Sequence, residues 1–258
     1  MRLFDTHCHL TDERFDEDRA ETIARMQAAG VERALLVGDG SQEEQPVFAL
    51  ARQYDWMYAA TGVHPHDASC WSDAAAARIE RCMADEKAVA LGEIGLDYHY
   101  EDIPREIQKN AFRMQLALAR ELSMPVVVHE REAHEDGMRI IDEFPEVKGV
   151  FHCYSGSLEM AKELVKRGWY IGFTGVITFK NARKAVEVAE WLPLSRTLIE
   201  TDCPYMAPEP YRGRRCDPSM VPQMAKKIAE IKGLAPEAVA QATFRNAVTL
   251  FRLDAAGV

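Results

Sequence analysis

The chain contains 258 residues, of which 47% are hydrophobic, and it carries a formal net charge of −10. This length can bury a full hydrophobic core without disulfides or structural metals, and it matches the roughly 250 residues of one α/β barrel. The composition excludes a disordered or fibrous protein. The acidic balance argues against a protein that is held to nucleic acid or to a membrane by its overall charge.

The cysteines and the N-terminus indicate a reducing compartment. Six cysteines are scattered without a Cys-x-x-Cys pair, which argues against a disulfide framework and a zinc knuckle. The N-terminal sequence MRLFDTHCHL contains no apolar signal segment, and no run of about 18 apolar residues occurs in the chain. We therefore expect a cytoplasmic protein that does not contact a membrane, and we favour a monomer.

Short apolar runs alternate with longer amphipathic runs along the chain, which predicts strands followed by helices. The predicted strands are Leu3–His9, Ala34–Gly38, Met57–Val63, Ala88–Gly95, Pro125–His129, Lys148–Cys153, Trp169–Thr174 and Thr197–Asp202. The predicted helices are 14–29, 43–53, 72–85, 104–122, 135–143, 157–167, 179–191, 218–232 and 236–252. This order predicts an α/β fold, a (β/α)₈ barrel that forms one domain over residues 1–258. An open doubly wound sheet is the alternative, but no glycine-rich phosphate loop follows any predicted strand.

Side chains that could bind a metal stand at the ends of five predicted strands. His7 and His9 close the first strand and share a face, because strand residues two apart point the same way. The others are Glu93, His129, His152 and Asp202. In a barrel all six meet at the carboxyl end, where this fold carries its active sites. Each residue alone could be an ordinary hydrogen-bonded side chain, but imidazoles and carboxylates together are typical ligands of divalent transition metals.

Further polar and aromatic residues are expected at the same mouth. The candidates for substrate binding are His64, Arg131, Tyr154, Arg212 and Arg214, together with Arg215, Tyr205 and Tyr211. The arginines after the eighth strand could bind phosphate, and the tyrosines could pack against a base or sugar. Other roles remain open for these residues. His64 could be a turn histidine, the arginines could be a solvated run of charges, and the tyrosines could pack in the core or in a lid.

Strand alternation predicts two further groups below the mouth. Cys8, Cys153 and Cys203 each adjoin a proposed ligand, so they should point away from the mouth and pack as small hydrophobic residues. Asp5 and Glu200 should face the barrel interior, either orienting ligand histidines or forming internal ion pairs. Since no G-x-S-x-G nucleophile motif occurs, a metal-activated water is the expected nucleophile.

Seven segments in order resemble one known family. They are FDTHCHL, GVHPH, GEIGLDYH, VVVHEREA, FHCYSG, ETDCPYMAPEPYRGRR and RNAVTLF. Together they resemble the TatD family of metal-dependent hydrolases, within the amidohydrolase-like superfamily. The resemblance covers essentially the whole chain and implies a distorted TIM barrel, a two-metal centre and deoxyribonuclease activity.

The resemblance also implies roles for single residues. It makes His7, His9 and Asp202 the ligands of one metal, His129 and His152 the ligands of the other, and Glu93 the bridge between them. The first histidine of GVHPH, His64, matches a family histidine near the substrate.

One segment departs from the family pattern. Glu130-Arg131-Glu132-Ala133 stands where the family usually has Ser- or Asn-Arg-Asp-Ala. Glu130 is therefore expected to add negative charge near the substrate entrance or to recruit another cation.

The leading hypothesis is a deoxyribonuclease that uses two divalent metal ions (Zn, Mg, Mn or Ni), with Asp202 and Glu93 as catalytic residues. Two bound cations would make the mouth locally positive despite the acidic chain. The substrate is then expected to be single-stranded DNA or strand ends rather than broadly bound duplex. The alternatives are hydrolysis of a small amide, ester or lactone at the same site and a non-catalytic metal-binding interaction protein.

Overall fold

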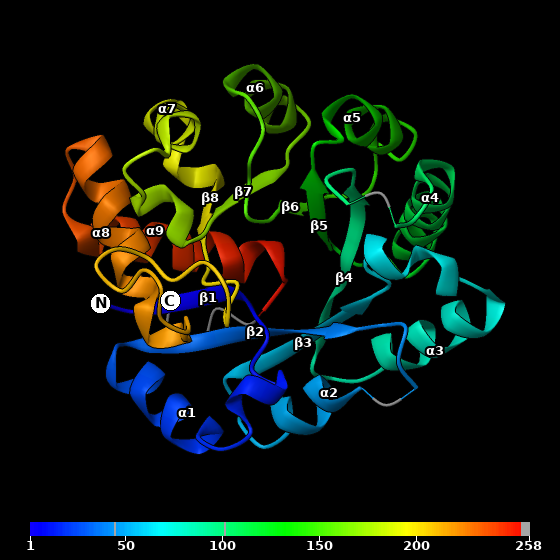
Figure 1. Cartoon of the computed structure of the whole chain (residues 1–258), viewed down its shortest axis with the longest axis horizontal. Helices are drawn as coiled ribbons and strands as arrows, with labels where there is room; N and C mark the ends of the chain where they lie inside the picture. The colour runs from blue at the N-terminus through cyan, green and yellow to red at the C-terminus, as the bar shows by residue number, and fades with distance from the viewer. Residues whose placement is uncertain (44, 101, 254–258) are drawn as a thin grey trace.

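Eight parallel strands form one nearly closed barrel in the computed structural model, which describes residues 1–43, 45–100 and 102–253 (Figure 1). They are β1 (Leu3–Cys8), β2 (Val31–Asp39), β3 (Met57–Gly62), β4 (Ala88–Asp97), β5 (Val126–Arg131), β6 (Gly149–Phe151), β7 (Tyr170–Phe173) and β8 (Thr197–Ile199). Each strand pairs with the next along the chain, and a bridge between Cys8 and Cys203 brings the segment after β8 against β1. The predicted (β/α)₈ barrel is confirmed.

Eight helices surround the strands in Figure 1. They are α1 (Arg19–Ala28), α2 (Pro46–Ala51), α3 (Asp73–Met83), α4 (Arg105–Glu121), α5 (His134–Asp142), α6 (Leu158–Lys166), α7 (Arg183–Trp191) and α8 (Val221–Lys232). Local sequence sets several ends: the Ser72 and Ser157 side chains accept backbone N–H groups at the starts of α3 and α6. No helix in the described part of the chain is long and apolar enough to cross a membrane.

Two predicted boundaries were wrong in ways that concern the mouth of the barrel. β4 continues to Asp97, so its last residues reach the rim. β8 ends at Ile199, and Asp202 lies in the following loop with a positive φ of 54°. Its backbone N–H donates to the His7 carbonyl over 2.9 Å, which ties this loop to the end of β1.

The first predicted helix also begins later than expected. The Asp12 side chain accepts the N–H of Arg14 and starts a short 3₁₀ turn, Glu13–Phe15, so α1 begins only at Arg19. Residue 44, within the predicted helix 43–53, and residues 254–258, at the end of the predicted domain 1–258, lie outside the described residues.

The amino end of the barrel is closed by the last helix, α9 (Pro236–Leu250), which crosses behind the strands in Figure 1. Inward-facing residues of the strands, among them Phe4, Leu35 and Val127, form one buried cluster with Phe244 of this helix. The rings of Phe4 and Phe244 lie 6.1 Å apart. Because the apolar packing fills this end, the polar residues of the interior gather at the opposite, carboxyl end.

We expect Phe244→Ala to lower the free energy of unfolding by about 3–5 kcal/mol, because it leaves a cavity in the cluster that closes the barrel. Thr249→Ala, at an exposed position on the same helix, should change it by less than about 0.5 kcal/mol. Urea unfolding of both variants measures the difference. Equal stabilities would contradict a closing role for α9.

Candidate metal centre

A pocket of about 630 Å³ opens at the carboxyl ends of the strands. Five of the six predicted metal ligands line it: His9, Glu93, His129, His152 and Asp202. The sixth, His7, is fully buried beneath them. The structure therefore brings together residues that lie as far apart in the sequence as His7 and Asp202.

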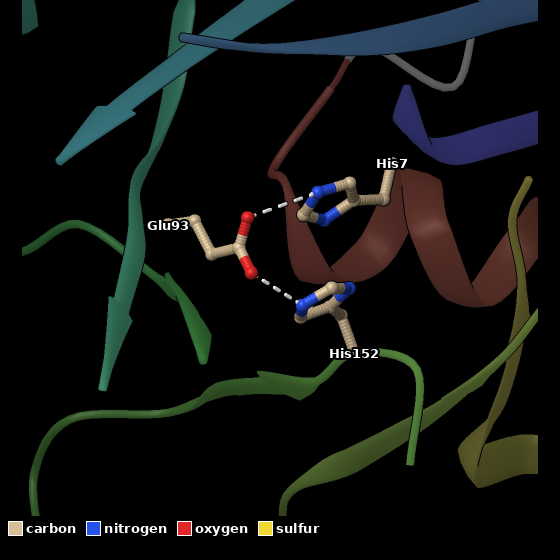
Figure 2. Close-up of side chains that lie close together, drawn as sticks. All are labelled: His7, Glu93 and His152. Atoms are coloured by element: carbon tan, nitrogen blue, oxygen red, sulfur yellow. Dashed lines mark ion pairs between the residues drawn. The ribbon is translucent and has the colours of Figure 1, made fainter. Parts of the chain in front are cut away.

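The carboxylate of Glu93, on β4, faces His7 and His152 (Figure 2). One carboxylate oxygen lies 3.3 Å from Nε2 of His7, and the other lies 2.5 Å from Nε2 of His152. The second oxygen also lies 2.8 Å from Nδ1 of His129. Each oxygen of one buried carboxylate thus faces a separate set of imidazole nitrogens.

Asp202 completes the first set. The Nε2 atoms of His7 and His9 lie 3.1 Å apart, and a carboxylate oxygen of Asp202 lies 3.4 Å from Nε2 of His9. The same oxygen lies 3.8 Å from Nε2 of His7. These atoms are close enough to be ligands of a single ion.

Asp97, at the end of β4, is a residue that the sequence reasoning missed. Its carboxylate lies 3.0 Å from Nε2 of His129 and 3.1 Å from Nε2 of His66. Asp97 stands four residues after Glu93, and this even spacing within a strand was the available signal that both point to the same face. It lies on the side of the His129 ring opposite Glu93, where a carboxylate can orient a metal-binding imidazole.

Hydrogen bonds orient two of the histidine rings. Nδ1 of His9 lies 3.1 Å from the Val37 carbonyl, so this nitrogen donates a hydrogen bond and Nε2 faces the centre. In His129 the Nε2–H donates a hydrogen bond to the Asp97 carboxylate, and Nδ1 faces Glu93. In both rings the nitrogen that faces the centre can bind a cation once it has lost its proton.

The electrostatics of the pocket favour positive charge. Burial lowers the pKa of His7 to about 4, so its ring is neutral at pH 7. Burial also lowers the pKa of His9 and His129, but hydrogen bonds to Asp202 and to Asp97 outweigh it and raise these pKa values to about 9 and about 10.

Among the described residues, every ion-pair partner of Glu93 and Asp202 is a histidine. Without a metal, the protons on His9 and His129 balance the charge of the two buried carboxylates. Divalent cations would replace these protons, so this donor set of imidazoles and carboxylates fits a metal centre.

Asp5 and Glu200 lie below the centre and hold the backbone that carries ligands. Asp5 accepts the N–H and the hydroxyl of Thr201 over 2.9 and 2.6 Å. Glu200 accepts the backbone N–H of Cys153 over 2.6 Å and lies 3.7 Å from Nδ1 of His152. Burial raises the pKa of Asp5 to about 8 and that of Glu200 to about 7. Glu200 therefore fits the internal ion-pair alternative, with His152 as its partner, whereas Asp5 anchors the loop before Asp202.

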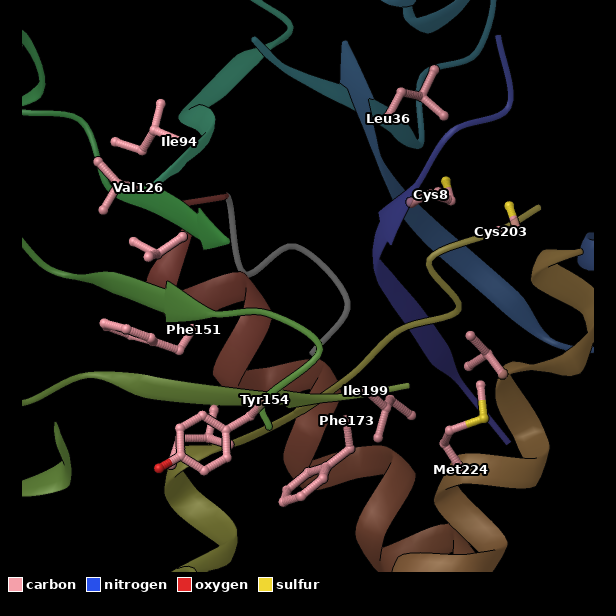
Figure 3. Close-up of a cluster of buried hydrophobic side chains, with 14 of the residues drawn as sticks. Cys8, Leu36, Ile94, Val126, Phe151, Tyr154, Phe173, Ile199, Cys203 and Met224 are labelled. Atoms are coloured by element: carbon pink, nitrogen blue, oxygen red, sulfur yellow. The ribbon is translucent and has the colours of Figure 1, made fainter. Parts of the chain in front are cut away.

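Two of the three cysteines next to the ligands pack as small hydrophobic residues. Cys8 and Cys203 belong to the hydrophobic layer between strands and helices, as predicted (Figure 3). Cys153 is half-buried, and its Sγ lies 3.3 Å from the Thr174 hydroxyl.

The predicted substrate residues divide into two groups. His64 and Arg131 line the pocket, but Tyr154, Arg212 and Arg214 do not. Tyr154 is only 6% exposed and lies in the hydrophobic layer, where its hydroxyl donates to the Ser157 carbonyl (Figure 3).

The arginines after β8 separate because their loop turns them towards different neighbours. Arg212 stacks over the Phe179 ring at 4.0 Å, and Arg214 is exposed beside the positive-φ Gly213. Arg215 bonds to the Arg14 carbonyl and to Asp18. A shared loop therefore did not bring the three arginines together at one phosphate site.

Glu130 does not point into the substrate entrance. Its carboxylate accepts the Ala133 N–H over 2.7 Å and lies 2.6 Å from Nδ1 of His134, at the start of α5. The expectation that it repels a phosphate or recruits a cation was wrong, because the carboxylate is buried against the Ala133 N–H and the His134 ring and does not line the pocket.

Comparisons with known proteins agree with this geometry. A family model described as "TatD related DNase" matches residues 4–252. The chain is 44% identical to the uncharacterized metal-dependent hydrolase YabD of Bacillus subtilis, covering 98% of this chain and 100% of the relative. It is 38% identical to the 3'-5' ssDNA/RNA exonuclease TatD of Cronobacter sakazakii, covering 98% and 99%. The crystal structure of YJJV, a TatD homolog from Escherichia coli K12, has a TM-score of 0.92 at 32% identity and covers 98% and 99%.

We expect Asp97→Asn to weaken binding of one metal by about 10- to 100-fold, because the amide cannot hold the His129 ring in the same way. Chelator competition followed by elemental analysis measures this. Asp12→Asn is a matched control, since Asp12 lines the same pocket but bonds to Arg14. Wild-type affinity for every bound metal in Asp97→Asn would contradict this role.

The hydrogen bond to Glu130 raises the pKa of His134 above its ordinary value. The folded protein then holds this proton more tightly than the unfolded chain, so the pair stabilises fully below about pH 6.5 and is lost as the pH rises through the raised pKa. His134→Ala should therefore cost more stability near pH 5.5 than near pH 9. The difference should be of the order of 0.5 kcal/mol, because solvent screens a partly exposed pair. It should disappear in a Glu130→Gln background, and thermal unfolding at the two pH values tests both statements.

Proposed function

This chain belongs to the TatD family of metal-dependent hydrolases, and from that premise we propose that it cleaves phosphodiester bonds in single-stranded DNA or at strand ends. The observation that carries the proposal is the buried Glu93 carboxylate, with each oxygen facing a different group of histidines. This arrangement suits two cations held side by side. In two-metal enzymes such a pair stabilises the attacking and the leaving oxygen when a phosphate ester is cleaved.

We propose a centre of two divalent ions, Zn, Mg, Mn or Ni. The ligands would be His7, His9 and Asp202 for one ion and His129 and His152 for the other, with Glu93 as the bridge. The ions would supply Lewis acidity, which lowers the pKa of water towards about 7 and withdraws charge from the phosphate.

Asp202 would orient the attacking water and accept its proton. Burial raises the pKa of Asp202, but the hydrogen bond to His9 and the neighbouring imidazoles outweigh it, so the carboxylate is ionised. The water oxygen bonds to phosphorus as the bond to the leaving oxygen breaks, and that oxygen takes a proton from solvent.

His64 would donate a hydrogen bond to the phosphate. Burial lowers its pKa to about 3, so the ring is neutral and carries one proton. Its Nδ1 accepts the backbone N–H of His66 over 3.2 Å, which leaves the proton on Nε2. This nitrogen lies 3.7 Å from the Glu93 carboxylate, at the wall of the pocket. Arg131, which lines the same pocket, would add positive charge for the entering strand.

We further propose a monomer that acts in the cytoplasm. The six cysteines are all free thiols, which suits a reducing compartment. Hydrolysis of a small amide, ester or lactone was favoured by the negative charge expected from Glu130. Since the Glu130 carboxylate is bound to Ala133 and His134 at the start of α5, it no longer supports that alternative.

We expect Asp202→Ala and Glu93→Ala to reduce degradation of end-labelled single-stranded DNA by at least about 100-fold, since each removes a group that touches the reacting atoms. The circular dichroism spectrum should be unchanged, which separates lost chemistry from lost folding. Glu132→Gln is the control, because that carboxylate is 61% exposed and pairs with His99. Retained activity in either alanine variant would rule out the proposed mechanism, and metal bound without turnover would favour a non-catalytic binding protein.

A further inference from the structure

Two exposed tyrosines stand at the rim of the metal pocket. Tyr100, in the loop after β4, is 47% exposed, and Tyr205, in the loop after β8, is 50% exposed. They are the exposed tyrosines of the described residues, and both line the pocket. Large aromatic surface left in water around a polar pocket indicates a binding surface.

The two rings belong to opposite walls of the mouth. Eight strands follow one another around the barrel, so β4 and β8 are four places apart and face each other (Figure 1). The same walls carry Glu93 and Asp202 deeper in the pocket. A chain that crosses the mouth from one wall to the other therefore passes one tyrosine, the predicted metal centre and then the second tyrosine.

Neighbouring side chains hold each ring in place. The guanidinium of Arg131 lies 5.4 Å from the ring centre of Tyr100, and the rings of His66 and His99 contact it edge-on. The guanidinium of Arg14 lies 4.4 Å from the ring centre of Tyr205.

Arg14 is itself fixed by two bonds of 2.8 Å to the Asp12 carboxylate. A supported ring that keeps half of its surface exposed can stack on a base with little loss of side-chain entropy. The adjacent guanidinium groups carry the charge that attracts phosphates.

We propose that Tyr100 and Tyr205 form a two-sided stacking site for the nucleobases on either side of the phosphate that is cleaved. The inference rests on the proposed nuclease function and adds a reason why single-stranded DNA would be preferred to a duplex. Bases in a duplex are already paired and stacked on each other, so they cannot turn towards the two rings without unstacking. An unpaired strand can present both bases at once, and stacking tolerates any base because every base has a π-face.

The test pairs protein variants with altered substrates. Fluorescence anisotropy of the metal-loaded protein measures binding of a short single-stranded oligonucleotide with phosphorothioate linkages, which slow hydrolysis. Tyr100→Ala and Tyr205→Ala should each weaken binding by roughly 5- to 100-fold. The phenylalanine variants should bind like the unmodified protein, because stacking needs the ring and not the hydroxyl. Trp191→Ala, an exposed aromatic residue on α7, is the matched control and should change nothing.

A second oligonucleotide that lacks bases on both sides of the central linkage should bind the unmodified protein and the alanine variants equally weakly. Tyrosine variants that bind the intact strand normally, or that lose affinity equally for both strands, would overturn the proposal. So would a loss in the phenylalanine variants as large as in the alanine variants.

The outcome is separable from that of the proposed function. Hydrolysis of unmodified DNA with tyrosine-independent binding overturns the stacking site alone. Tyrosine-dependent binding without any hydrolysis supports the stacking site and contradicts the nuclease.

Discussion

The carboxylate of Glu93 is the group around which the carboxyl end of the barrel is organised. It is almost fully removed from water, and a buried carboxylate is costly unless opposite charge or hydrogen-bond donors surround it. Here the surrounding groups are His7, His129 and His152, which come from three other parts of the barrel. Each of these rings points one nitrogen at that carboxylate. The carboxylate and the three rings therefore enclose a site that favours positive charge.

A second layer of polar groups keeps this site in place. Asp97 holds the far side of the His129 ring, the Val37 carbonyl holds His9, and Glu200 holds the backbone beside His152. These bonds run to strands and loops that other parts of the barrel already fix. The free-energy cost of burying these polar side chains is confined to the carboxyl end of the barrel, because α9 and the apolar cluster around Phe244 fill the amino end. This division leaves one open, charged mouth for a substrate.

Much of this arrangement could be predicted from residue patterns, although each pattern had limits. Alternation along β1 correctly turned His7 and His9 to one side and Cys8 to the other, because side-chain direction in a strand follows directly from sequence position. The same rule was not enough beyond the strand ends. β8 stops at Ile199, so Asp202 reaches the centre from a loop whose backbone path no periodicity describes.

Apolar periodicity and the residue types at the strand ends were enough to predict the order of strands and helices and the chemical character of the mouth. Only the tertiary structure decided which polar groups are used there. Glu130 binds the Ala133 N–H at the start of α5, Tyr154 entered the hydrophobic layer, and Asp97 binds the His129 ring. The physical reason is that a side chain's role depends on the neighbours within a few ångströms, and those neighbours come from distant positions that meet only when the barrel closes.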